Sequence, residues 1–246
     1  MKVYLQTDEK GLPIDYDHYS AGYGFGKMGF EIVKFNNYEQ LKTSELCDVI
    51  VGYGKPIETR LNDFEIHIPN IDYPDELTKY LGRKIWKSTI NTINNNPDLW
   101  GVFVKPINRK AFSGRVVNSS KDLIGCGLGD KDQEIYVSEV LNFVSEYRIF
   151  VRYGSIIDMR HYSGDWSILP DVNVIFNCIR DYVTGPKTYA IDFGVTKDNT
   201  TNLIEVNVSG SIGSYGLEPI MYAKFMSARW SELTGTRDEC DFDLFR

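Results

Sequence analysis

Three oxygen-bearing side chains on two neighbouring apolar segments could together hold a metal ion. In the segment NLIEVNV, Glu205 and Asn207 alternate with apolar residues, so both point to one face of a strand, about 6.6 Å apart at 3.3 Å per residue. In the segment TYAIDFGV, Asp192 lies between two small residues that leave room for a ligand. Mg²⁺ prefers carboxylate and carbonyl oxygens together with phosphates. The pattern predicts a Mg²⁺ site at these residues, with a hairpin that has a solvated polar face as the alternative.

The loop between these two segments decides whether such a site can form. If residues 197–200 make a four-residue loop, Thr196 pairs with Thr201 and Asp192 lies directly opposite Glu205. Opposed residues have Cβ atoms about 4.5–5.5 Å apart, close enough to share a cation. A five-residue loop would instead set Asp192 opposite Val206 and turn it away from Glu205. We therefore expect the four-residue loop.

Two lysines and a glycine-containing turn could bind phosphates. Lys105 stands in the apolar segment VFVKP, where a buried cation is costly unless an anion meets it; a lysine on an edge strand is the alternative. The basic turn that follows contains Lys110, Ser113 and Gly114, and it could fold its amides and ammonium group over phosphates; a loop without a ligand is the alternative. Neither GxxxxGK[ST] nor a GxGxxG between a strand and a helix is present, so no classical nucleotide motif applies.

An arginine in a third apolar segment could bind an anion through two parallel hydrogen bonds. In EYRIFVRYG, Glu146 and Arg148 share one face of the expected strand, and Arg148 has apolar neighbours on both sides. A guanidinium group there suits a phosphate or a carboxylate. The alternative is a structural pair between Arg148 and Glu146 on a solvated face. The three histidines, His18, His67 and His161, lack metal or triad spacing, so structural roles are expected.

The hydrophobic pattern divides the chain into an α/β part and a β-rich part. Strands at 2–6, 30–35 and 47–54 and a helix at 16–29 predict a small α/β unit, followed by a helix at 74–94. The later segments predict an antiparallel sheet with helices on one side: strands at 101–106, 134–141, 146–154, 155–164, 188–195 and 202–208, and helices near 170–184 and 217–234. We predict an α+β protein with domains at 1–75 and 76–246.

Composition excludes several classes of function. The 246 residues include 27 basic and 34 acidic side chains, for a net charge of -7, so no overall basic surface draws the protein to nucleic acid or to an anionic membrane. Charged residues precede any apolar run at the start, and later runs are strand-sized, so neither an export signal nor a membrane span is expected. Four widely spaced cysteines favour reduced thiols in a cytoplasmic protein.

The order of these segments resembles the ATP-grasp superfamily. LGRKIW, VFVKP, KAFSG, SEYRIFV, YAIDFGV and LIEVN follow one another between residues 80 and 220, as in a small bacterial and phage group of ATP-grasp proteins of the R2K-like clade. The N-terminal α/β unit is similar to the domain that precedes the ATP-grasp domain in that superfamily. EVN is followed by VSGSIG rather than the common EVNP-type ending, and the glycine loop is short; both departures affect the substrate pocket.

The resemblance implies an ATP-dependent carboxylate–amine ligase that proceeds through an acyl phosphate, with an amino acid, a peptide or another small carboxylate as substrate. It implies that Lys105 and Lys110 contact the phosphates of ATP and that Mg²⁺ is held by the three oxygen-bearing residues above. Adenine would meet the backbone of Glu139, Val140 and Leu141. Glu146 would face the ribose or orient Arg148, Arg148 would stabilise the transferred phosphoryl group, and Arg160 would hold the acceptor carboxylate.

Two further functions stay open at this point. An ATP-grasp kinase or phosphotransferase would stop at a phosphorylated product, and a non-catalytic binding protein would keep the fold alone. The presence of Lys105, Arg148, Asp192, Glu205 and Asn207 argues against the non-catalytic binding protein. Direct nucleic-acid binding is not expected, although a macromolecular substrate such as RNA stays open, as does the oligomeric state.

Overall fold

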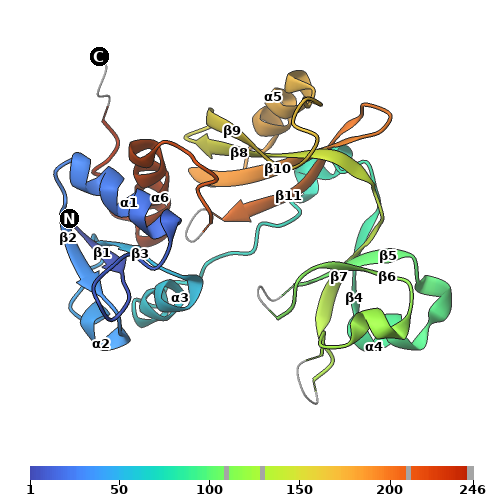
Figure 1. Cartoon of the computed structure of the whole chain (residues 1–246), viewed down its shortest axis with the longest axis horizontal. Helices are drawn as coiled ribbons and strands as arrows, with labels where there is room; N and C mark the ends of the chain where they lie inside the picture. The colour runs from blue at the N-terminus through green and yellow to red at the C-terminus, as the bar shows by residue number, and fades with distance from the viewer. Residues whose placement is uncertain (108–110, 128–130, 209–211, 243–246) are drawn as a thin grey trace. The chain divides into compact units, whose positions relative to one another are not determined.

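A computed structural model describes residues 1–107, 111–127, 131–208 and 212–242, and it shows an α+β fold (Figure 1). The chain forms two compact units, Met1–Tyr80 with Val144–Arg246 (unit 1) and Leu81–Phe143 (unit 2). Lys110 lies outside the described residues. The predicted domain boundary between residues 75 and 76 stays a prediction.

Unit 1 contains two sheets and the longest helix. Its elements are β1 (Lys2–Gln6), α1 (Tyr16–Lys27), β2 (Glu31–Phe35), α2 (Tyr38–Leu41), β3 (Val49–Val51), α3 (Gly54–Asp63), a 3₁₀ helix (Asp75–Tyr80), β8 (Phe143–Arg152), β9 (Ser155–Gly164), α5 (Val172–Asp181), β10 (Thr188–Thr196), β11 (Thr201–Val208) and α6 (Pro219–Thr234). Unit 2 contains β4 (Ile85–Thr89), α4 (Ile90–Asn95), β5 (Val102–Pro106), β6 (Arg115–Val117), β7 (Glu134–Glu139) and 3₁₀ helices at Pro97–Leu99 and Ser120–Leu123.

The first sheet of unit 1 is parallel, with the order β2-β1-β3, which confirms the predicted α/β unit. Helix α1 begins after Asp15, whose carboxylate accepts a hydrogen bond from the backbone N–H of His18, an arrangement typical of helix N-caps. Val3, Val49 and Phe25 are almost fully buried in the core shared by these elements. Hydrophobic burial therefore fixes α1 against the sheet.

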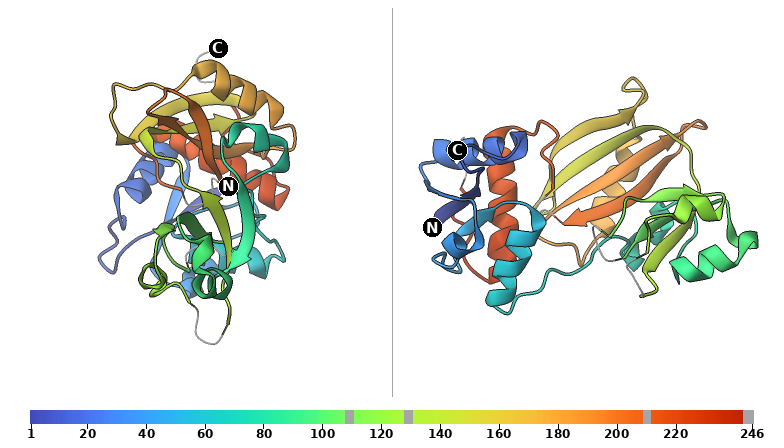
Figure 2. Two further views of the ribbon diagram at one scale, coloured as in Figure 1. Left: turned by 90° about the vertical axis from the view of Figure 1, so that its right-hand side faces the viewer. Right: turned by 60° about the horizontal axis from the view of Figure 1, so that its bottom comes forward.

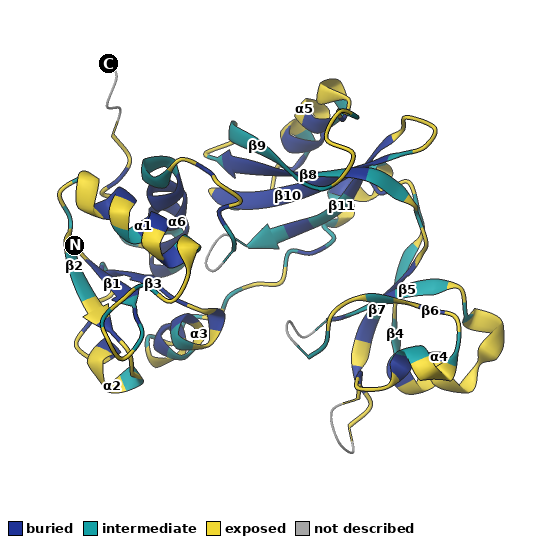
Figure 3. Ribbon diagram, in the orientation of Figure 1, coloured by how far each residue is buried: buried dark blue, intermediate teal, exposed yellow. Residues whose placement is uncertain are grey.

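The second sheet of unit 1 is antiparallel, with the order β11-β10-β8-β9. Every residue of β10 except the last is buried, Asp192 included (Figure 3). Helix α6 packs against α1, β3 and β10 and so joins the two sheets into one core (Figure 2). A Cβ atom at Gly24 of α1 would lie 2.0 Å from the carbonyl oxygen of Pro219, so only glycine permits the two helices to approach this closely.

Unit 2 is built on one antiparallel sheet, with the order β4-β7-β5-β6. Its core contains buried aliphatic residues of β5, β6 and β7, among them Val104, Val117 and Val137, and α4 contributes Ile93. Strand β5 is an interior strand because β7 and β6 pair with its two sides. The unit therefore has its own hydrophobic centre.

Two sequence predictions about the fold are wrong. The predicted helix at 74–94 is instead a 3₁₀ helix, strand β4 and the short helix α4. Gly82 has a φ of 62°, which interrupts helical geometry, and Ile85 to Thr89 pair with β7 as a strand. The predicted single antiparallel sheet is in fact two sheets. Within the described part of the chain, strands β4 to β7 pair only with one another, and strands β8 to β11 pair only with one another.

All four cysteines are free thiols, as predicted. Within residues 1–107, 111–127, 131–208 and 212–242, none of the helices has the length and apolar character that crossing a membrane requires.

Candidate active site

An arginine and an aspartate on neighbouring strands form the centre of the site in unit 1. Arg148 of β8 donates from Nε to Asp192 Oδ1 (2.8 Å) and from Nη2 to Asp192 Oδ2 (2.7 Å). The two side chains are only 9% and 3% exposed. The alternative of a solvated Arg148–Glu146 pair is therefore wrong, because Arg148 is buried and its ion-pair partner is Asp192.

Asp192, Glu205 and Asn207 lie on one face of the β10–β11 hairpin. Asp192 is directly opposite Glu205, and Ala190 is opposite Asn207. The Asn207 amide nitrogen donates to Asp192 Oδ2 (3.2 Å) and to Glu205 Oε1 (2.9 Å). The predicted pairing of Asp192 with Glu205 is thus present.

The loop that produces this pairing differs from the prediction. The last pair before the turn is Val195 with Thr201, so Thr196 does not pair with Thr201, and Phe193 pairs with Leu203. A β-bulge between Asp192 and Phe193 then leaves Ile204 without a directly opposed residue and restores the Asp192–Glu205 pair. Without that extra residue in the ladder, Glu205 would point to the opposite face.

Burial makes the Asp192 carboxylate difficult to ionise. Burial and the nearby carboxylates of Glu205 and Glu146 outweigh the stabilising guanidinium of Arg148 and raise the pKa of Asp192 to about 6 from its usual 3.8. Burial also opposes the charge of Arg148, but Asp192 outweighs it and raises the pKa of Arg148 above its ordinary value. A cation next to this carboxyl group would favour its ionised form.

Two tyrosines surround the Arg148 guanidinium, and neither was predicted from the sequence. Its central carbon lies 4.7 Å from the ring centroid of Tyr215 and 5.9 Å from that of Tyr162. Tyr162 also donates its hydroxyl to Glu146 (2.8 Å), the residue expected to face the ribose or orient Arg148. These contacts restrict the guanidinium through cation–π attraction.

Arg160 lies next to this cluster on β9, directly opposite Arg148. Its Nε donates to Asp158 Oδ2 (2.9 Å), and the side chain is 36% exposed. A partly exposed arginine that donates to one aspartate has further N–H groups that it can donate to a substrate carboxylate. Its predicted role stays a prediction.

The other predicted site residues lie in unit 2. Half-buried Lys105 is on β5 opposite Tyr136 of β7, one residue beyond the part of β5 that pairs with β6. Glu139 ends β7 and accepts a hydrogen bond from the backbone N–H of Lys84 (2.8 Å). Val140 and half-buried Leu141 follow β7 in an irregular segment. These positions bring Lys105 and the end of β7 onto neighbouring strands of one sheet.

The glycine turn has a packing role that the sequence did not indicate. A Cβ atom at Gly114 would lie 2.5 Å from Phe103 Cζ, so the backbone there rests on an aromatic ring. Ser113 is exposed and its carbonyl accepts a hydrogen bond from Arg115 Nε (3.3 Å). The predicted phosphate contacts of Ser113, Gly114 and Lys110 stay predictions.

The donor set in unit 1 suits a hard cation. No cluster of three or more His, Cys, Asp or Glu in a metal-binding arrangement occurs among the described residues, and the set here is two carboxylates with one amide. Asn207 presents its amide nitrogen to both carboxylates, and a turn of that amide would present its oxygen instead. Carboxylate and amide oxygens are among the ligands that Mg²⁺ accepts beside phosphates and water.

Comparison with known proteins identifies the family of the chain. The sequence model of the ATP-grasp domain, R2K clade family 2, matches residues 80–225, more than half of the chain. No curated protein sequence matches the chain significantly.

Solved structures share the fold at low sequence identity. D-cycloserine synthetase DcsG is 13% identical, with a TM-score of 0.58 over 94% of this chain and 100% of that chain. D-alanine–D-alanine ligase from Bacillus anthracis is 13% identical, with a TM-score of 0.55 over 94% and 96%. The ATP-grasp ligase PsnB, complexed with a minimal precursor, is 13% identical, with a TM-score of 0.54 over 92% and 98%.

Proposed function

Because the chain belongs to family 2 of the R2K clade of ATP-grasp domains, we propose that it joins a carboxylate to an amine at the expense of ATP. ATP would phosphorylate the carboxylate, and the amine would then displace phosphate from the acyl phosphate. The observation that carries this proposal is the buried Arg148 guanidinium bonded to Asp192 beside Glu205 and Asn207. Such a combination suits phosphoryl transfer, which depends mainly on positioning and charge neutralisation.

Each residue of unit 1 has a distinct role in this proposal. Arg148 would bind the oxygens of the transferred phosphoryl group with its planar fork, and Arg160 would hold the acceptor carboxylate. Asp192, Glu205 and Asn207 would hold Mg²⁺, which supplies charge neutralisation at the phosphates when it is bound. Tyr215 and Tyr162 keep the guanidinium of Arg148 in place.

Residues of unit 2 would bind the nucleotide. Lys105 and Lys110 would contact phosphates, with Ser113 and Gly114 in the turn that covers them. Residues 139–141 would meet adenine through backbone donors and acceptors, as purine sites commonly do. Glu146 would face the ribose or orient Arg148.

The substrate class that we propose is an amino acid, a peptide or another small carboxylate. Peptides are included because one fold relative, PsnB, is complexed with a minimal precursor.

ADP release in the presence of Mg²⁺-ATP tests the proposal. Pools of amino acids and peptides are supplied with and without hydroxylamine, and products are identified by mass spectrometry. We expect carboxylate-dependent ADP release and a hydroxamate, since hydroxylamine intercepts an acyl phosphate. A stable phosphorylated product without hydroxamate would indicate a kinase instead, and absence of ADP release with every pool would support a binding protein.

A further inference from the structure

A tight turn over residues 214–217 lies between β11 and α6 of unit 1. The backbone N–H of Leu217 donates to the carbonyl oxygen of Ser214 (2.8 Å), and the two central residues, Tyr215 and Gly216, have φ of 48° and 81°. Positive φ at both central positions is typical of a type I′ turn. Glycine adopts such values freely, whereas a bulky side chain is strained there. Tyr215 is therefore held in a conformation that it would not adopt unaided.

The strained tyrosine contacts the arginine of the candidate active site. The Tyr215 ring centroid lies 4.7 Å from the central guanidinium carbon of Arg148, and Arg148 also donates two hydrogen bonds to Asp192. Tyr215 is 47% exposed, so burial of its own ring does not account for the strain. Strained residues persist only where the surrounding structure holds them, and they cluster at functional sites. The contacts that hold this turn therefore bear on how Arg148 is placed.

Asp17 of α1 holds the first residue of the turn. Asp17 Oδ1 accepts hydrogen bonds from the backbone N–H of Ser214 (2.9 Å) and from the Ser214 hydroxyl (2.6 Å), although 197 positions of the chain separate the two residues. Ser214 is fully buried, and a buried N–H group without an acceptor is costly. Asp17 therefore ties the turn to the first helix of the chain.

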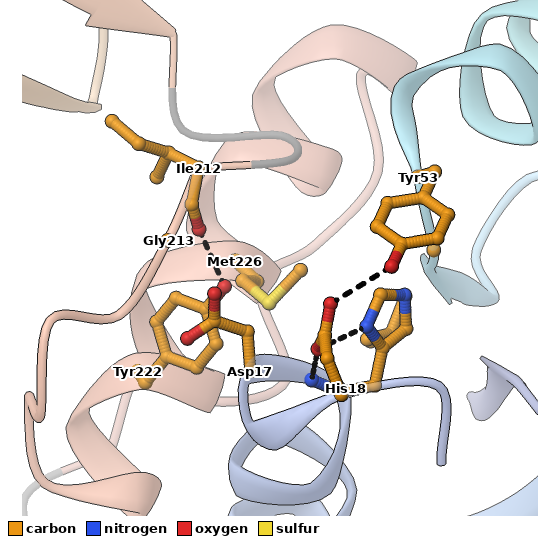
Figure 4. A pocket seen from close by; sticks show the side chains of 10 residues that line it. Asp17, His18, Tyr53, Ile212, Gly213, Tyr222 and Met226 are labelled. Carbon is orange, nitrogen blue, oxygen red and sulfur yellow. Dashed lines mark hydrogen bonds and ion pairs between the residues drawn. The ribbon is translucent and has the colours of Figure 1, made fainter.

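The segment that leads into the turn is fixed from two sides. The Tyr222 hydroxyl of α6 donates to the carbonyl oxygen of Ile212 (2.6 Å), the dashed line between these residues in Figure 4. A Cβ atom at Gly213 would lie 3.2 Å from Asp17 Oδ2 and 3.3 Å from Tyr215 Cε2. The glycine thus lets the carboxylate and the ring lie close to the backbone, and Figure 4 shows Asp17 beside Gly213. Helices α1 and α6 together fix this segment.

The contact with Tyr215 bears on the direction in which Arg148 can donate. A guanidinium group has five N–H donors, and Asp192 accepts from two of them, on Nε and Nη2. The remaining donors stay aimed at a phosphoryl group only while the plane of the guanidinium is fixed. The Tyr215 ring next to the guanidinium restricts its tilt through cation–π attraction.

We propose that Asp17 is a positioning residue for Arg148. Through Ser214 it holds Tyr215 against the guanidinium and so fixes the direction of the N–H groups that Arg148 presents. The assignment rests on the proposed function for the role of Arg148 in phosphoryl transfer. The acceptor oxygen of Asp17 is the group that acts, so asparagine can replace the aspartate and alanine cannot.

NMR of the full chain labelled with ¹⁵N-arginine tests the positioning without turnover. Loss of one signal in Arg148→Lys assigns the Nε–H of Arg148, which the ring current of Tyr215 shifts. We expect Asp17→Ala to move this signal toward its position in Tyr215→Gly, whereas Asp17→Asn leaves it in place. Ser214→Ala removes one of the two hydrogen bonds and should move the signal in the same direction by less.

Asp8→Ala is the matched control. Asp8 also holds a turn, because its Oδ1 accepts from the backbone N–H groups of Lys10 (2.9 Å) and Leu12 (2.8 Å). Its replacement should leave the Arg148 signal at the wild-type position.

Turnover provides a second readout. Tyr215→Gly should stay folded, because glycine adopts the φ of this position freely. In Tyr215→Gly and Asp17→Ala, kcat for ADP release should fall about 10- to 100-fold with KM for ATP unchanged, since the misplaced guanidinium acts in the transition state. Asp17→Asn should restore kcat to near the wild-type value. A merely structural role of the turn would not separate kcat from KM in this way.

The two readouts separate this proposal from the ligase proposal. An Arg148 signal that stays in place in both Asp17→Ala and Ser214→Ala, or wild-type kcat in folded Tyr215→Gly, would overturn the positioning role. Equal shifts in Asp17→Asn and Asp17→Ala would also overturn it, because asparagine keeps the acceptor. A shift in Asp17→Ala but not in Asp17→Asn, with no ADP release from the wild type on any carboxylate, would support the positioning role and refute the ligase function.

Discussion

Arg148 and Asp192 form a buried ion pair with two parallel hydrogen bonds of 2.8 and 2.7 Å across neighbouring strands. Removing two charges from water is costly, so a buried pair of this kind contributes little net stability. Here it keeps the guanidinium beside Glu205 and Asn207, the residues proposed to hold Mg²⁺. The pair therefore fixes the position of the guanidinium next to the residues that would hold the metal ion.

The first prediction concerns the shape of the arginine. Arg148→Lys keeps a positive charge but replaces the planar fork with a single ammonium group. Loss of one transition-state contact typically reduces kcat by about 100- to 1000-fold, and we expect a reduction of this size in ADP release. Circular dichroism should show that the variant is folded.

Arg180→Lys provides the control for that experiment. Arg180 is on α5 with a side chain 72% exposed, so its replacement should leave ADP release unchanged. Turnover near the wild-type rate in a folded Arg148→Lys protein would remove Arg148 from the catalytic residues.

The second prediction concerns pH. Since the pKa of Asp192 is about 6 in the folded protein against a usual 3.8, the folded state binds this proton more tightly than the unfolded state. The stability that protonated Asp192 contributes is present below about pH 4 and is lost as the pH rises to about 6. The free energy of unfolding of the metal-free protein should therefore fall across this range relative to Asp192→Asn.

Urea unfolding at several pH values measures this difference. Subtracting the Asp192→Asn curve removes the other acids that titrate in the same range. Asp192→Asn should be less stable overall because it leaves Arg148 without its anion. A difference that grows from pH 4 to pH 6 would show that Arg148, rather than burial, determines the ionisation of Asp192.

The third prediction tests the Mg²⁺ ligands. Glu205→Gln and Asn207→Ala should each raise the Mg²⁺ concentration needed for half-maximal ADP release by at least about tenfold. Glu205→Gln should leave the metal-free protein as stable as the wild type or more stable, because a carboxylate opposite Asp192 is removed.

Glu31→Gln is a suitable control for these variants, since Glu31 is an exposed glutamate on β2 of the same unit. It should change neither Mg²⁺ dependence nor stability by a measurable amount. If both test variants respond to Mg²⁺ like the wild type, the three residues do not form the metal site.

The sequence predicts part of this site because strand alternation is a local property. This alternation places Glu205 and Asn207 on one face of β11. The burial of β10 is expected from its apolar residues. The bulge at Ile204 cannot be predicted in this way, since a ladder irregularity depends on how two strands pair. The correct partner for Asp192 was therefore predicted with the wrong loop.

Residues that act through distant contacts were not predictable from the sequence. Tyr215 contacts Arg148 across 67 positions of the chain, and no local pattern around it indicates this. The helix expected at 74–94 failed for the opposite reason: the apolar spacing was helical, but Gly82 and pairing with β7 determine the structure. Tertiary pairing overrides local periodicity at such positions.

The last prediction concerns the nucleotide. Lys105 on β5 and residues 139–141 at the end of β7 lie on neighbouring strands of unit 2, where a lysine could meet phosphates and a backbone segment could meet adenine. We expect a non-hydrolysable ATP analogue to protect the backbone amides of 102–106 and 139–141 from hydrogen exchange. Lys105→Ala should weaken binding of the analogue about 10- to 100-fold, as expected for loss of a charged hydrogen bond to phosphate.

Lys121→Ala is the matched control, because Lys121 is exposed on a 3₁₀ helix of the same unit and should bind the analogue like the wild type. Protection confined to residues 1–54 would instead place the nucleotide on the parallel sheet of unit 1. Unchanged affinity in Lys105→Ala, with protection still present at 139–141, would retain the adenine contact and remove Lys105 as its phosphate ligand. The two measurements thus test the two halves of the nucleotide site separately, since exchange reports on the backbone and the substitution reports on the ammonium group.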